Sequence, residues 1–261
     1  MLAEAAALLA LAAPGDAAYS FAVSVARDGP RPAGSAAEAR AHGRIARRFR
    51  AAGLTVRVQR FPTPRGRSRN VIGVREGQED CLRVLMAHTD SMPAGPGAED
   101  NASGVGVLAA LAPRLRSPEC DVWLVATGAE ERLYTGSPDH LGARALAPTV
   151  PRRRLRYALS LDEVGTSARL RLRSPAAAPR RSVERELLRA AENVSPPTLR
   201  VDWQRDSGTG NSDHRELELS GRRGVKLGVV DNPCRHMACD TPDRLRKGAF
   251  RAVLRLLERV L

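Results

Sequence analysis

Two short apolar runs constrain the fold of this chain more than any other feature. "CLRVLMAH" (residues 81–88) and "DVWLVATG" (residues 121–128) lack the polar–apolar alternation of a strand with one solvated face. Uninterrupted runs of this kind are typical of central strands that are covered on both faces. Between them, "SGVGVLAALAPRL" (residues 103–115) has helical spacing. A strand, a helix and a second strand therefore follow one another.

The rest of the chain continues this pattern. Ser35 and Glu38 have the spacing of a capping box that opens a helix, which we expect to run to about Ala52. The other predicted elements are strands at 54–61 and 70–76, a helix near Pro138 to Leu146, strands at 157–165 and 168–173, a helix at 182–193, strands at 198–203 and 224–230, and a closing helix from Thr241 to Leu261. Strands that alternate with helices predict a three-layer α/β/α sandwich with a mostly parallel central sheet, in one domain over residues 1–261.

The sequence does not predict a membrane-spanning segment. No stretch approaches the roughly 20 consecutive apolar residues that cross a bilayer as a helix. The N-terminal "LAEAAALLALAA" (residues 2–13) has the apolar core of a signal peptide, but it contains Glu4 and lacks a basic region before it. We read residues 1–15 as an amphipathic helix, with a signal remnant or a misplaced start as the alternatives.

The net charge of +13 raises the question of nucleic-acid binding, since a basic protein attracts phosphates. Only Lys226 and Lys247 are lysines, and the other basic residues are arginines among many Ala, Gly and Pro. This bias is typical of GC-rich coding. Aromatic residues, which would stack on bases, make up only 3% of the chain. We therefore expect no nucleic-acid partner.

Carboxylates and imidazoles gather where the predicted strands end, and ligands of open α/β sheets bind at this edge. They lie where four of the predicted strands end or in the loops that follow, and comprise His88, Asp90, Asp100, Glu130, Glu131, Asp162, Glu163 and His236. Carboxylates that gather without Lys or Arg to balance them would repel one another, and a bound dication removes that repulsion. Two imidazoles with several carboxylates suit zinc. The loop from His88 to Asp100 is rich in Gly and Pro, as expected if it brings both residues to the metal.

Six short motifs, in this order, resemble those of a known family. They are "AHTDS" (87–91), "GAEDNASG" (97–104), "GAEE" (128–131) with "TGS" (135–137), "LSLDEVG" (159–165), "SDH" (212–214) and "DTPDRL" (240–245). Over nearly its whole length the chain resembles the secreted zinc aminopeptidases, which are di-zinc exopeptidases related to glutamate carboxypeptidases and glutaminyl cyclases. The resemblance implies a phosphorylase/hydrolase-like fold and removal of N-terminal residues from peptides with a free N-terminus.

The resemblance also implies a site for two zinc ions. His88 and Asp162 would bind one ion, Glu131 and His236 would bind the other, and Asp100 would bridge both. Two ions held in this way polarise one water molecule between them.

Other residues of the same loops are expected to support this site. The resemblance implies that Glu130 is the general base, which takes the proton of the attacking water. Asp90 can reach the far ring nitrogen of His88 and fix its tautomer. Glu99 is expected to be a solvated loop residue. The helix that starts after Asp100, at Asn101 and Ser103, would hold the Asp100 carboxylate with its backbone N–H groups.

Several positions depart from the family or have no assigned role. Family members often have Thr after the last histidine ligand and sometimes Tyr before it, and this chain has Met237 and Arg235 there. Arg235 is a candidate to replace that Tyr in the substrate site. His214 is assigned to structure or to the substrate pocket. His42 and His140 are expected at the surface.

The four cysteines form two candidate pairs. Cys81 and Cys120 each precede a predicted central strand, so they can pair at the amino ends of the strands if those strands are neighbours. Cys234 and Cys239 flank His236 and can close a small ring, with a zinc knuckle as the rival interpretation. Pairable cysteines favour a secreted protein over a reduced, cytoplasmic one.

These observations favour a monomeric zinc aminopeptidase. The alternatives are a glutaminyl cyclase or a carboxypeptidase on the same scaffold, and a protease-like binding domain that has lost its metals. Cyclases of this family typically use one zinc, whereas this chain retains five ligand positions. The 74-residue interval from Asp162 to His236 is too short for the dimerisation domain of a related di-zinc family.

Overall fold

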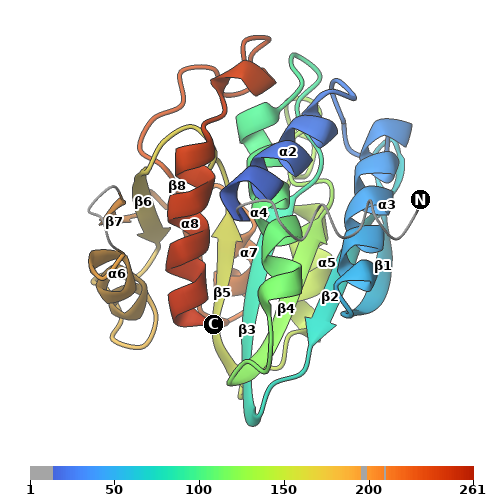
Figure 1. Ribbon diagram of the computed structural model, residues 1–261. Helices are drawn as coiled ribbons and strands as arrows, with labels where there is room; N and C mark the ends of the chain where they lie inside the picture. The colour runs from blue at the N-terminus through green and yellow to red at the C-terminus, as the bar shows by residue number, and fades with distance from the viewer. Residues whose placement is uncertain (1–13, 195–198, 209) are drawn as a thin grey trace, which may run out of the picture.

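The computed structural model describes residues 14–194, 199–208 and 210–261 (Figure 1). The N-terminal segment 2–13, for which the sequence suggested an amphipathic helix, lies outside the described residues. Among the described residues, no helix combines the length and the apolar character needed to cross a membrane.

One eight-stranded sheet forms the centre of the molecule, in the order β1-β2-β4-β3-β5-β8-β6-β7. The strands are β1 Thr55–Thr63, β2 Gly66–Arg75, β3 Glu79–His88, β4 Cys120–Thr127, β5 Leu155–Leu161, β6 Arg169–Ser174, β7 Arg200–Arg205 and β8 Gly224–Val229. Strands β4, β3, β5 and β8 are parallel, β1 and β2 form an antiparallel hairpin beside β4, and β6 runs antiparallel to β8 and parallel to β7. The predicted, mostly parallel sheet is confirmed.

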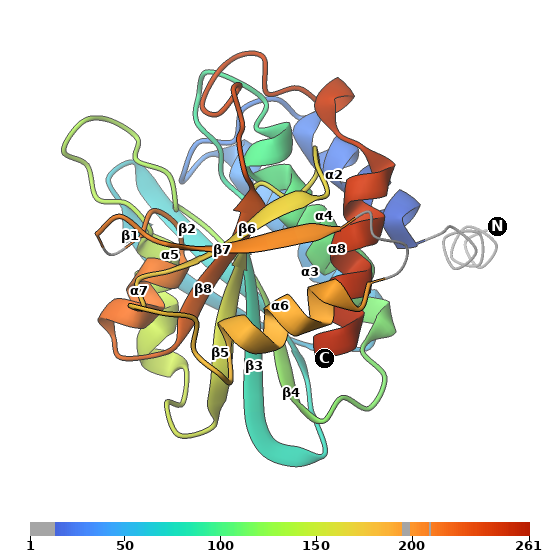
Figure 2. The same cartoon turned by 90° about the vertical axis from the view of Figure 1, so that its left-hand side faces the viewer.

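Helices cover both faces of this sheet. They are α2 Pro14–Ala26, α3 Ala36–Ala51, α4 Gly104–Leu111, α5 Leu141–Leu146, α6 Glu184–Glu192, α7 His214–Leu219 and α8 Lys247–Val260. Single turns of other helix types occur at Ala98–Ser103, Ala112–Arg114, Ala147–Thr149 and Pro242–Arg244. Figures 1 and 2 show α2, α3, α4 and α8 on one face and α5 and α7 on the other, which makes the predicted three-layer sandwich.

The central strands lack polar–apolar alternation because both faces are buried. In β3, Leu85 packs into the larger apolar core under α2, α4 and α8, whereas Val84 and Met86 pack into the smaller core with Leu146 and Leu217 of the opposite helices. Each of these five side chains is fully buried. The two runs that dominate the sequence pattern are therefore the strands between the two cores.

The predicted capping box at the start of α3 is half formed. The Ser35 hydroxyl accepts a hydrogen bond from the Glu38 backbone N–H at 3.1 Å, as expected. The Glu38 carboxylate does not return to Ser35; it accepts hydrogen bonds from the Gly34 N–H at 2.8 Å and the Ser68 hydroxyl at 2.6 Å. It also accepts the Ala129 N–H at 3.1 Å, so α3 is tied to the loop that follows β4.

Two helices begin later than the sequence predicted. The closing helix α8 starts at Lys247 and not at Thr241, because a separate turn ends at Arg244 and the chain is extended at Leu245 and Arg246. Helix α5 starts at Leu141 and not near Pro138, because His140 has a left-handed conformation with φ 50°.

Both predicted cysteine pairs are disulfides, so the zinc-knuckle alternative is excluded. Strands β3 and β4 are neighbours, and Cys81 and Cys120 are joined across them with 4.7 Å between their Cα atoms. Cys234 and Cys239 are joined within the loop after β8, with 5.4 Å between their Cα atoms.

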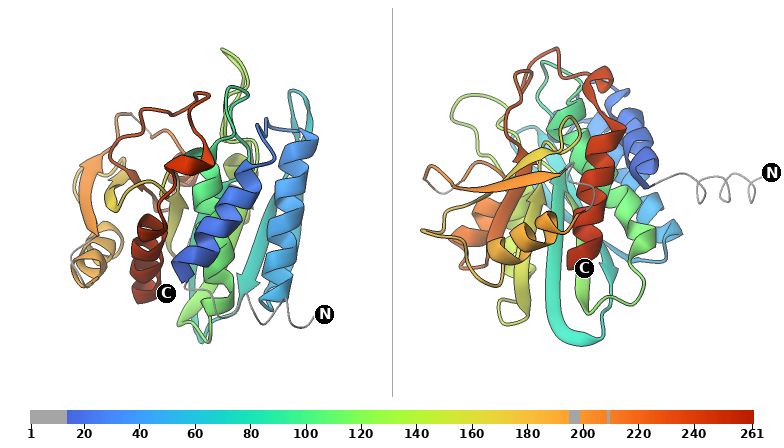
Figure 3. Two further views of the ribbon diagram at one scale, coloured as in Figure 1. Left: turned by 45° about the horizontal axis from the view of Figure 1, so that its top comes forward. Right: turned by 60° about the vertical axis from the view of Figure 1, so that its left-hand side comes forward.

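The loops that follow the parallel strands meet at one edge of the sheet. Figure 1 shows the loops after β3 and β8 at the top of the molecule, and Figure 3 shows the same edge brought forward. The first disulfide lies near the opposite, amino ends of β3 and β4.

Candidate metal centre

The connections after four strands, β3, β4, β5 and β8, bring the predicted ligand residues together at the carboxyl edge of the sheet. His88 is the last residue of β3, Asp162 directly follows β5, and Glu131 lies in the loop after β4. Asp100 lies in the turn before α4, and His236 lies in the disulfide-closed loop after β8. All are buried except His236, whose side chain is 38% exposed.

Asp100 lies between the two imidazoles. Its Oδ1 atom is 3.1 Å from His88 Nε2, and its Oδ2 atom is 3.2 Å from His236 Nε2. A second carboxylate lies near the same nitrogen of each ring: Asp162 Oδ1 is 3.5 Å from His88 Nε2, and Glu131 Oε2 is 3.1 Å from His236 Nε2. Each imidazole thus faces one carboxylate of its own, Asp162 or Glu131, and the Asp100 carboxylate that both imidazoles share.

The spacing and the chemistry of these atoms fit zinc. Ligands that are about 2.0–2.1 Å from a tetrahedral zinc lie roughly 3.3 Å from one another, which matches the nitrogen–oxygen separations given above. Three oxygens of the cluster, Asp100 Oδ2, Glu131 Oε1 and Asp162 Oδ1, are buried and accept no hydrogen bond within the described residues. Buried carboxylate oxygens without donors are costly unless a cation neutralises them.

Without a metal ion, protons would supply the positive charge of this cluster. Hydrogen bonds to Asp100 and Glu131 raise the pKa of His236 to about 10. Burial lowers the pKa of His88, but Glu130, Asp100 and the other carboxylates around it raise that pKa well above its ordinary value. A zinc ion must displace these protons to bind, so its affinity depends on pH.

Asp90 holds the pair of glutamates in place. Its Oδ1 accepts a hydrogen bond from the Glu130 N–H at 3.1 Å, and its Oδ2 accepts one from the Glu131 N–H at 2.9 Å. The far ring nitrogen of His88, Nδ1, faces the same residue: it lies 3.2 Å from the Asp90 carbonyl oxygen and 3.6 Å from Oδ1. Asp90 therefore contacts both the first histidine and the backbone of the two glutamates.

His140 lies inside the site, so the prediction that it is a surface residue is wrong. It is buried, and its Nε2 atom is 3.1 Å from Glu130 Oε1. Burial lowers its pKa, but the hydrogen bond and charge of Glu130 outweigh that effect and raise the pKa to about 9. Only the path of the loop after β4 brings this histidine back to Glu130, and no local pattern in the sequence indicates that path.

His42 is also buried, again contrary to the prediction. Its Nε2 atom lies 2.7 Å from the Thr89 hydroxyl, between α3 and the end of β3. The helical face on which it lies is the one that carries Ile45 and Phe49, which are in the core. That periodicity was the available signal.

The expectation that no basic residue balances the carboxylates is wrong. Lys226 is buried, and its Nζ atom lies 2.7 Å from Asp162 Oδ2 and 3.6 Å from Glu163 Oε2. Arg235 Nε lies 3.5 Å from Asp100 Oδ2. The free oxygen of Asp162, Oδ1, faces His88, so the ammonium leaves one metal-facing oxygen available. In the sequence, a lysine inside the apolar run "GVKLGVV" is the one signal of this pairing.

Glu99 is fully buried, which contradicts its expected exposure. Its carboxylate accepts hydrogen bonds from the Gly165 N–H at 2.9 Å and the Thr166 hydroxyl at 3.0 Å. Burial raises the pKa of Glu99 to about 8. This residue joins the Asp100 loop to the loop that follows Asp162.

The Asp100 backbone is held by Asp240, the first residue of the motif "DTPDRL", for which the sequence predicted no individual role. Asp240 accepts the backbone N–H groups of Glu99 at 2.8 Å and Asp100 at 3.0 Å. The N–H at the start of α4, expected to hold the Asp100 carboxylate, donates instead to Asn101 Oδ1 at 2.9 Å. Asp240 therefore couples the loop of His236 to the loop of Asp100.

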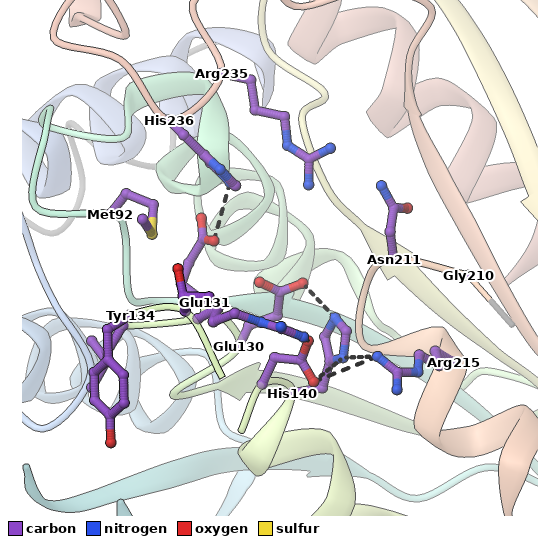
Figure 4. Close-up of a pocket in the computed structure, with 14 residues that line it drawn as sticks. Met92, Glu130, Glu131, Tyr134, His140, Gly210, Asn211, Arg215, Arg235 and His236 are labelled. Atoms are coloured by element: carbon purple, nitrogen blue, oxygen red, sulfur yellow. Dashed lines mark hydrogen bonds and ion pairs between the residues drawn. The ribbon is translucent and has the colours of Figure 1, made fainter. Parts of the chain in front are cut away.

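A cavity of about 590 Å³ opens beside the cluster (Figure 4). Its lining includes Glu130, Glu131, His236, Arg235, Met92, Tyr134, His140, Asn211 and Arg215. Figure 4 shows Arg235 and His236 reaching into it from one side and the two glutamates from another. His214 is buried next to this wall, and its Nε2 atom lies 2.8 Å from Asp206 Oδ2.

Comparison with known proteins gives a consistent result. The chain matches the model of peptidase family M28 over residues 70–261. It is 38% identical over 108 residues to the aminopeptidase YwaD of Bacillus subtilis (strain 168); this match covers 38% of the chain and only 22% of that relative.

Solved structures with low sequence identity share the fold. BSAP, a zinc aminopeptidase from Bacillus subtilis, has a TM-score of 0.81 at 18% identity, with 94% of this chain and 93% of that chain covered. Tannerella forsythia glutaminyl cyclase has a TM-score of 0.83 at 20% identity, with 93% and 96% covered. The family match covers most of the chain, including every candidate ligand, and we conclude that the chain belongs to peptidase family M28.

Proposed function

We propose that this protein is a di-zinc aminopeptidase that hydrolyses the first peptide bond of peptides with a free N-terminus. The observation that carries the proposal is the position of Asp100, which presents one carboxylate oxygen to each of two imidazoles. A carboxylate in this position can bridge two metal ions. The name of the relative YwaD, an aminopeptidase, points to the same reaction.

The donor atoms divide into two sets around Asp100. His88 and Asp162 would complete one zinc site, and His236 and Glu131 would complete the other. Bound zinc supplies Lewis-acid polarisation of a water molecule and of the scissile carbonyl. The loops that carry these residues are fixed by buried hydrogen bonds, so the donors are held in place before a metal binds.

Glu130 is the proposed general base. Its carboxylate is buried at the wall of the large cavity and is not needed in either donor set. It would take the proton of the attacking water and pass it to the leaving amine. His140, at 3.1 Å, orients the carboxylate, and Asp90 holds the Glu130 backbone.

The large cavity is the proposed site for the N-terminal residue. Its wall at the cluster is rich in carboxylates, one of which would bind the substrate ammonium and so restrict cleavage to chain ends. Its volume is ample for one side chain.

Two disulfides support an extracytoplasmic, secreted protein, and we expect a monomer with a single catalytic domain over residues 1–261.

Glutaminyl cyclisation is the second candidate, because a cyclase is among the similar structures. A peptide with N-terminal glutamine distinguishes the two reactions. An aminopeptidase releases free glutamine. A cyclase releases ammonia and leaves the peptide uncleaved, with its first residue closed into a ring. The convergence of five donor residues favours two metals and therefore the aminopeptidase.

The proposal is tested by metal analysis together with hydrolysis of leucine p-nitroanilide. We expect about two zinc ions per chain, loss of activity on exhaustive chelation, and recovery with zinc. Activity that persists without metal contradicts the mechanism. A folded protein that binds no zinc and hydrolyses nothing supports a binding domain instead.

A further inference from the structure

A second cavity, of about 200 Å³, lies beside the metal centre, and most of its charged lining residues are basic. It opens between β6, β8 and the loop that leads to His236. Its ionisable residues are Arg171, Arg173, Lys226, Arg235, Glu163 and Asp231. This cavity thus has four positive and two negative side chains in its lining, whereas carboxylates predominate at the proposed metal ligands. We call this space the basic cavity.

Arg171 and Arg173 reach the basic cavity because of the strand period. Leu170 and Leu172, which alternate with them in β6, are buried in the larger core, so the two arginines lie on the opposite face of the sheet. In the ladder with β8, Arg171 is opposite Gly228 and Arg173 is opposite Lys226.

These two arginines differ from the other cations of the basic cavity. Lys226 is paired with Asp162 at 2.7 Å, and Arg235 lies 3.5 Å from Asp100. Among the residues that the structure describes, the guanidinium groups of Arg171 and Arg173 make no hydrogen bond and no ion pair. Two partly buried guanidinium groups beside an ammonium repel one another, and a bound anion would remove that repulsion.

The basic cavity adjoins the large cavity, where the first residue of a peptide would lie, through a shared lining residue. Arg235 lines both cavities, and Figure 4 shows its side chain extending into the large one. Glu163 directly follows the ligand Asp162, and its carboxylate accepts a hydrogen bond from Asn232 of the opposite rim at 2.8 Å. A peptide whose first residue occupies the large cavity would therefore extend its second residue past Arg235 toward β6.

We propose that Arg171 and Arg173 bind a carboxylate of the residue that follows the scissile bond. This inference rests on the proposed aminopeptidase function, because that function fixes the direction of the peptide. A guanidinium group binds a carboxylate through two parallel N–H donors, which suits a planar anion better than an ammonium would. The carboxylate is either the C-terminus of a dipeptide or an acidic side chain in a longer peptide.

Binding of uncleavable substrate analogues tests the proposal without relying on turnover. Three probes contain a reduced bond in place of the scissile amide: leucyl-alanine with a free carboxylate, the same compound as its C-terminal amide, and leucyl-aspartate amide. Calorimetry on the zinc-loaded protein should show that a carboxylate-bearing probe binds about tenfold more tightly than the uncharged amide. The probe that binds more tightly identifies the source of the carboxylate.

The variants Arg171→Gln and Arg173→Gln should abolish most of this preference, because they remove the charge and keep hydrogen-bonding capacity. Arg169→Gln is the matched control: it lies on the same strand and the same face, but it is exposed and does not line the basic cavity. It should retain the preference. Thermal unfolding of each variant verifies that it is folded.

Two results would overturn the proposal. One is that the wild-type protein binds all three probes equally or binds none of them. The other is that the Arg171 and Arg173 variants keep the full preference for a carboxylate-bearing probe over the uncharged amide. Hydrolysis of leucine p-nitroanilide by the wild-type protein is measured separately. If this hydrolysis is absent while the preference for a carboxylate remains, the proposed function fails and the anion site stands.

Discussion

The Nζ atom of Lys226 lies 2.7 Å from Oδ2 of Asp162, while Oδ1 of the same carboxylate faces His88 and accepts no hydrogen bond within the described residues. Burial disfavours the charge of each group. Asp162 nevertheless raises the pKa of Lys226 above its ordinary value, and Lys226 lowers the pKa of Asp162 well below its own. One oxygen is thus held by an ammonium, and the other is left available for the proposed metal.

Lys226→Met should destabilise the metal-free protein. Removing one partner of a buried ion pair leaves an uncompensated charge, which costs on the order of 3 kcal/mol. Zinc should raise the unfolding temperature of this variant more than that of the wild type, because it neutralises Asp162. Lys247→Met is the control, since Lys247 is the other lysine and forms an exposed ion pair of little energetic value. Calorimetric unfolding with and without zinc measures both effects, and equal zinc-induced shifts would contradict this reading.

His140 should affect turnover more than substrate binding. Its Nε2 atom holds the Glu130 carboxylate, so His140→Leu should lower kcat about tenfold with a smaller change in KM. His140→Gln can still donate a hydrogen bond and should recover part of the loss. The pKa of His140 is raised to about 9, so wild-type activity should decline above that pH through a step that the Gln variant lacks. Equal losses of kcat in both variants with unchanged pH profiles would assign His140 a merely structural role.

The two disulfides should have separable effects. Replacement of Cys234 and Cys239 by Ser opens the ring around His236 and should lower zinc occupancy. Replacement of Cys81 and Cys120 by Ser is the control, because that pair lies near the amino ends of the strands; it should lower the unfolding temperature and leave zinc content unchanged. Zinc analysis after dialysis distinguishes the pairs. Mass spectrometry of the untreated wild type should detect no free thiol.

The sequence was sufficient to predict that the proposed metal ligands lie close together. His88 and Asp162 lie at the ends of apolar runs that are typical of central strands, and Glu131 follows another such run. Parallel strands bring their carboxyl ends to one edge of the sheet. The proximity of these residues can therefore be predicted without any knowledge of side-chain packing. The convergence of Asp100 and His236 was implied by motif order rather than by any local pattern.

The supporting residues could not be predicted, because their roles arise from contacts between distant loops. Glu99 reaches a loop 66 residues away, and its burial follows from that contact. Lys226 was read as part of an apolar strand, and its pairing with Asp162 depends on the β5–β8 ladder. Glu38 was assigned to a local cap, but Ser68 and Ala129 compete for its carboxylate. Periodicity describes which face a residue lies on and not which charged group it meets there.

His42 should make folding stability depend on pH below neutrality. Burial, more than any other factor, lowers its pKa from 6.5 to about 4 in the folded protein. As the pH falls through this window, the unfolded chain binds a proton that the folded protein does not, so roughly 3 kcal/mol of stability is lost. His42→Gln should remove this component. Denaturant unfolding at pH 7.5 and 4.5, in chelator to exclude zinc effects, compares the two proteins, and parallel pH dependence would contradict the prediction.

Glu130 and Glu131 are adjacent in sequence, and their proposed roles predict opposite responses to the same change. Glu130→Gln keeps size and hydrogen bonding but cannot accept a proton, so zinc content should stay near wild type while kcat falls by roughly two to four orders of magnitude. Glu131→Gln weakens a ligand of His236's zinc site, so it should lose zinc, and excess zinc should restore part of the activity. Metal analysis and kinetics on both variants test the assignment. Loss of zinc in the Glu130 variant with retention in the Glu131 variant would reverse the two roles, and unchanged activity in both would place the reaction elsewhere.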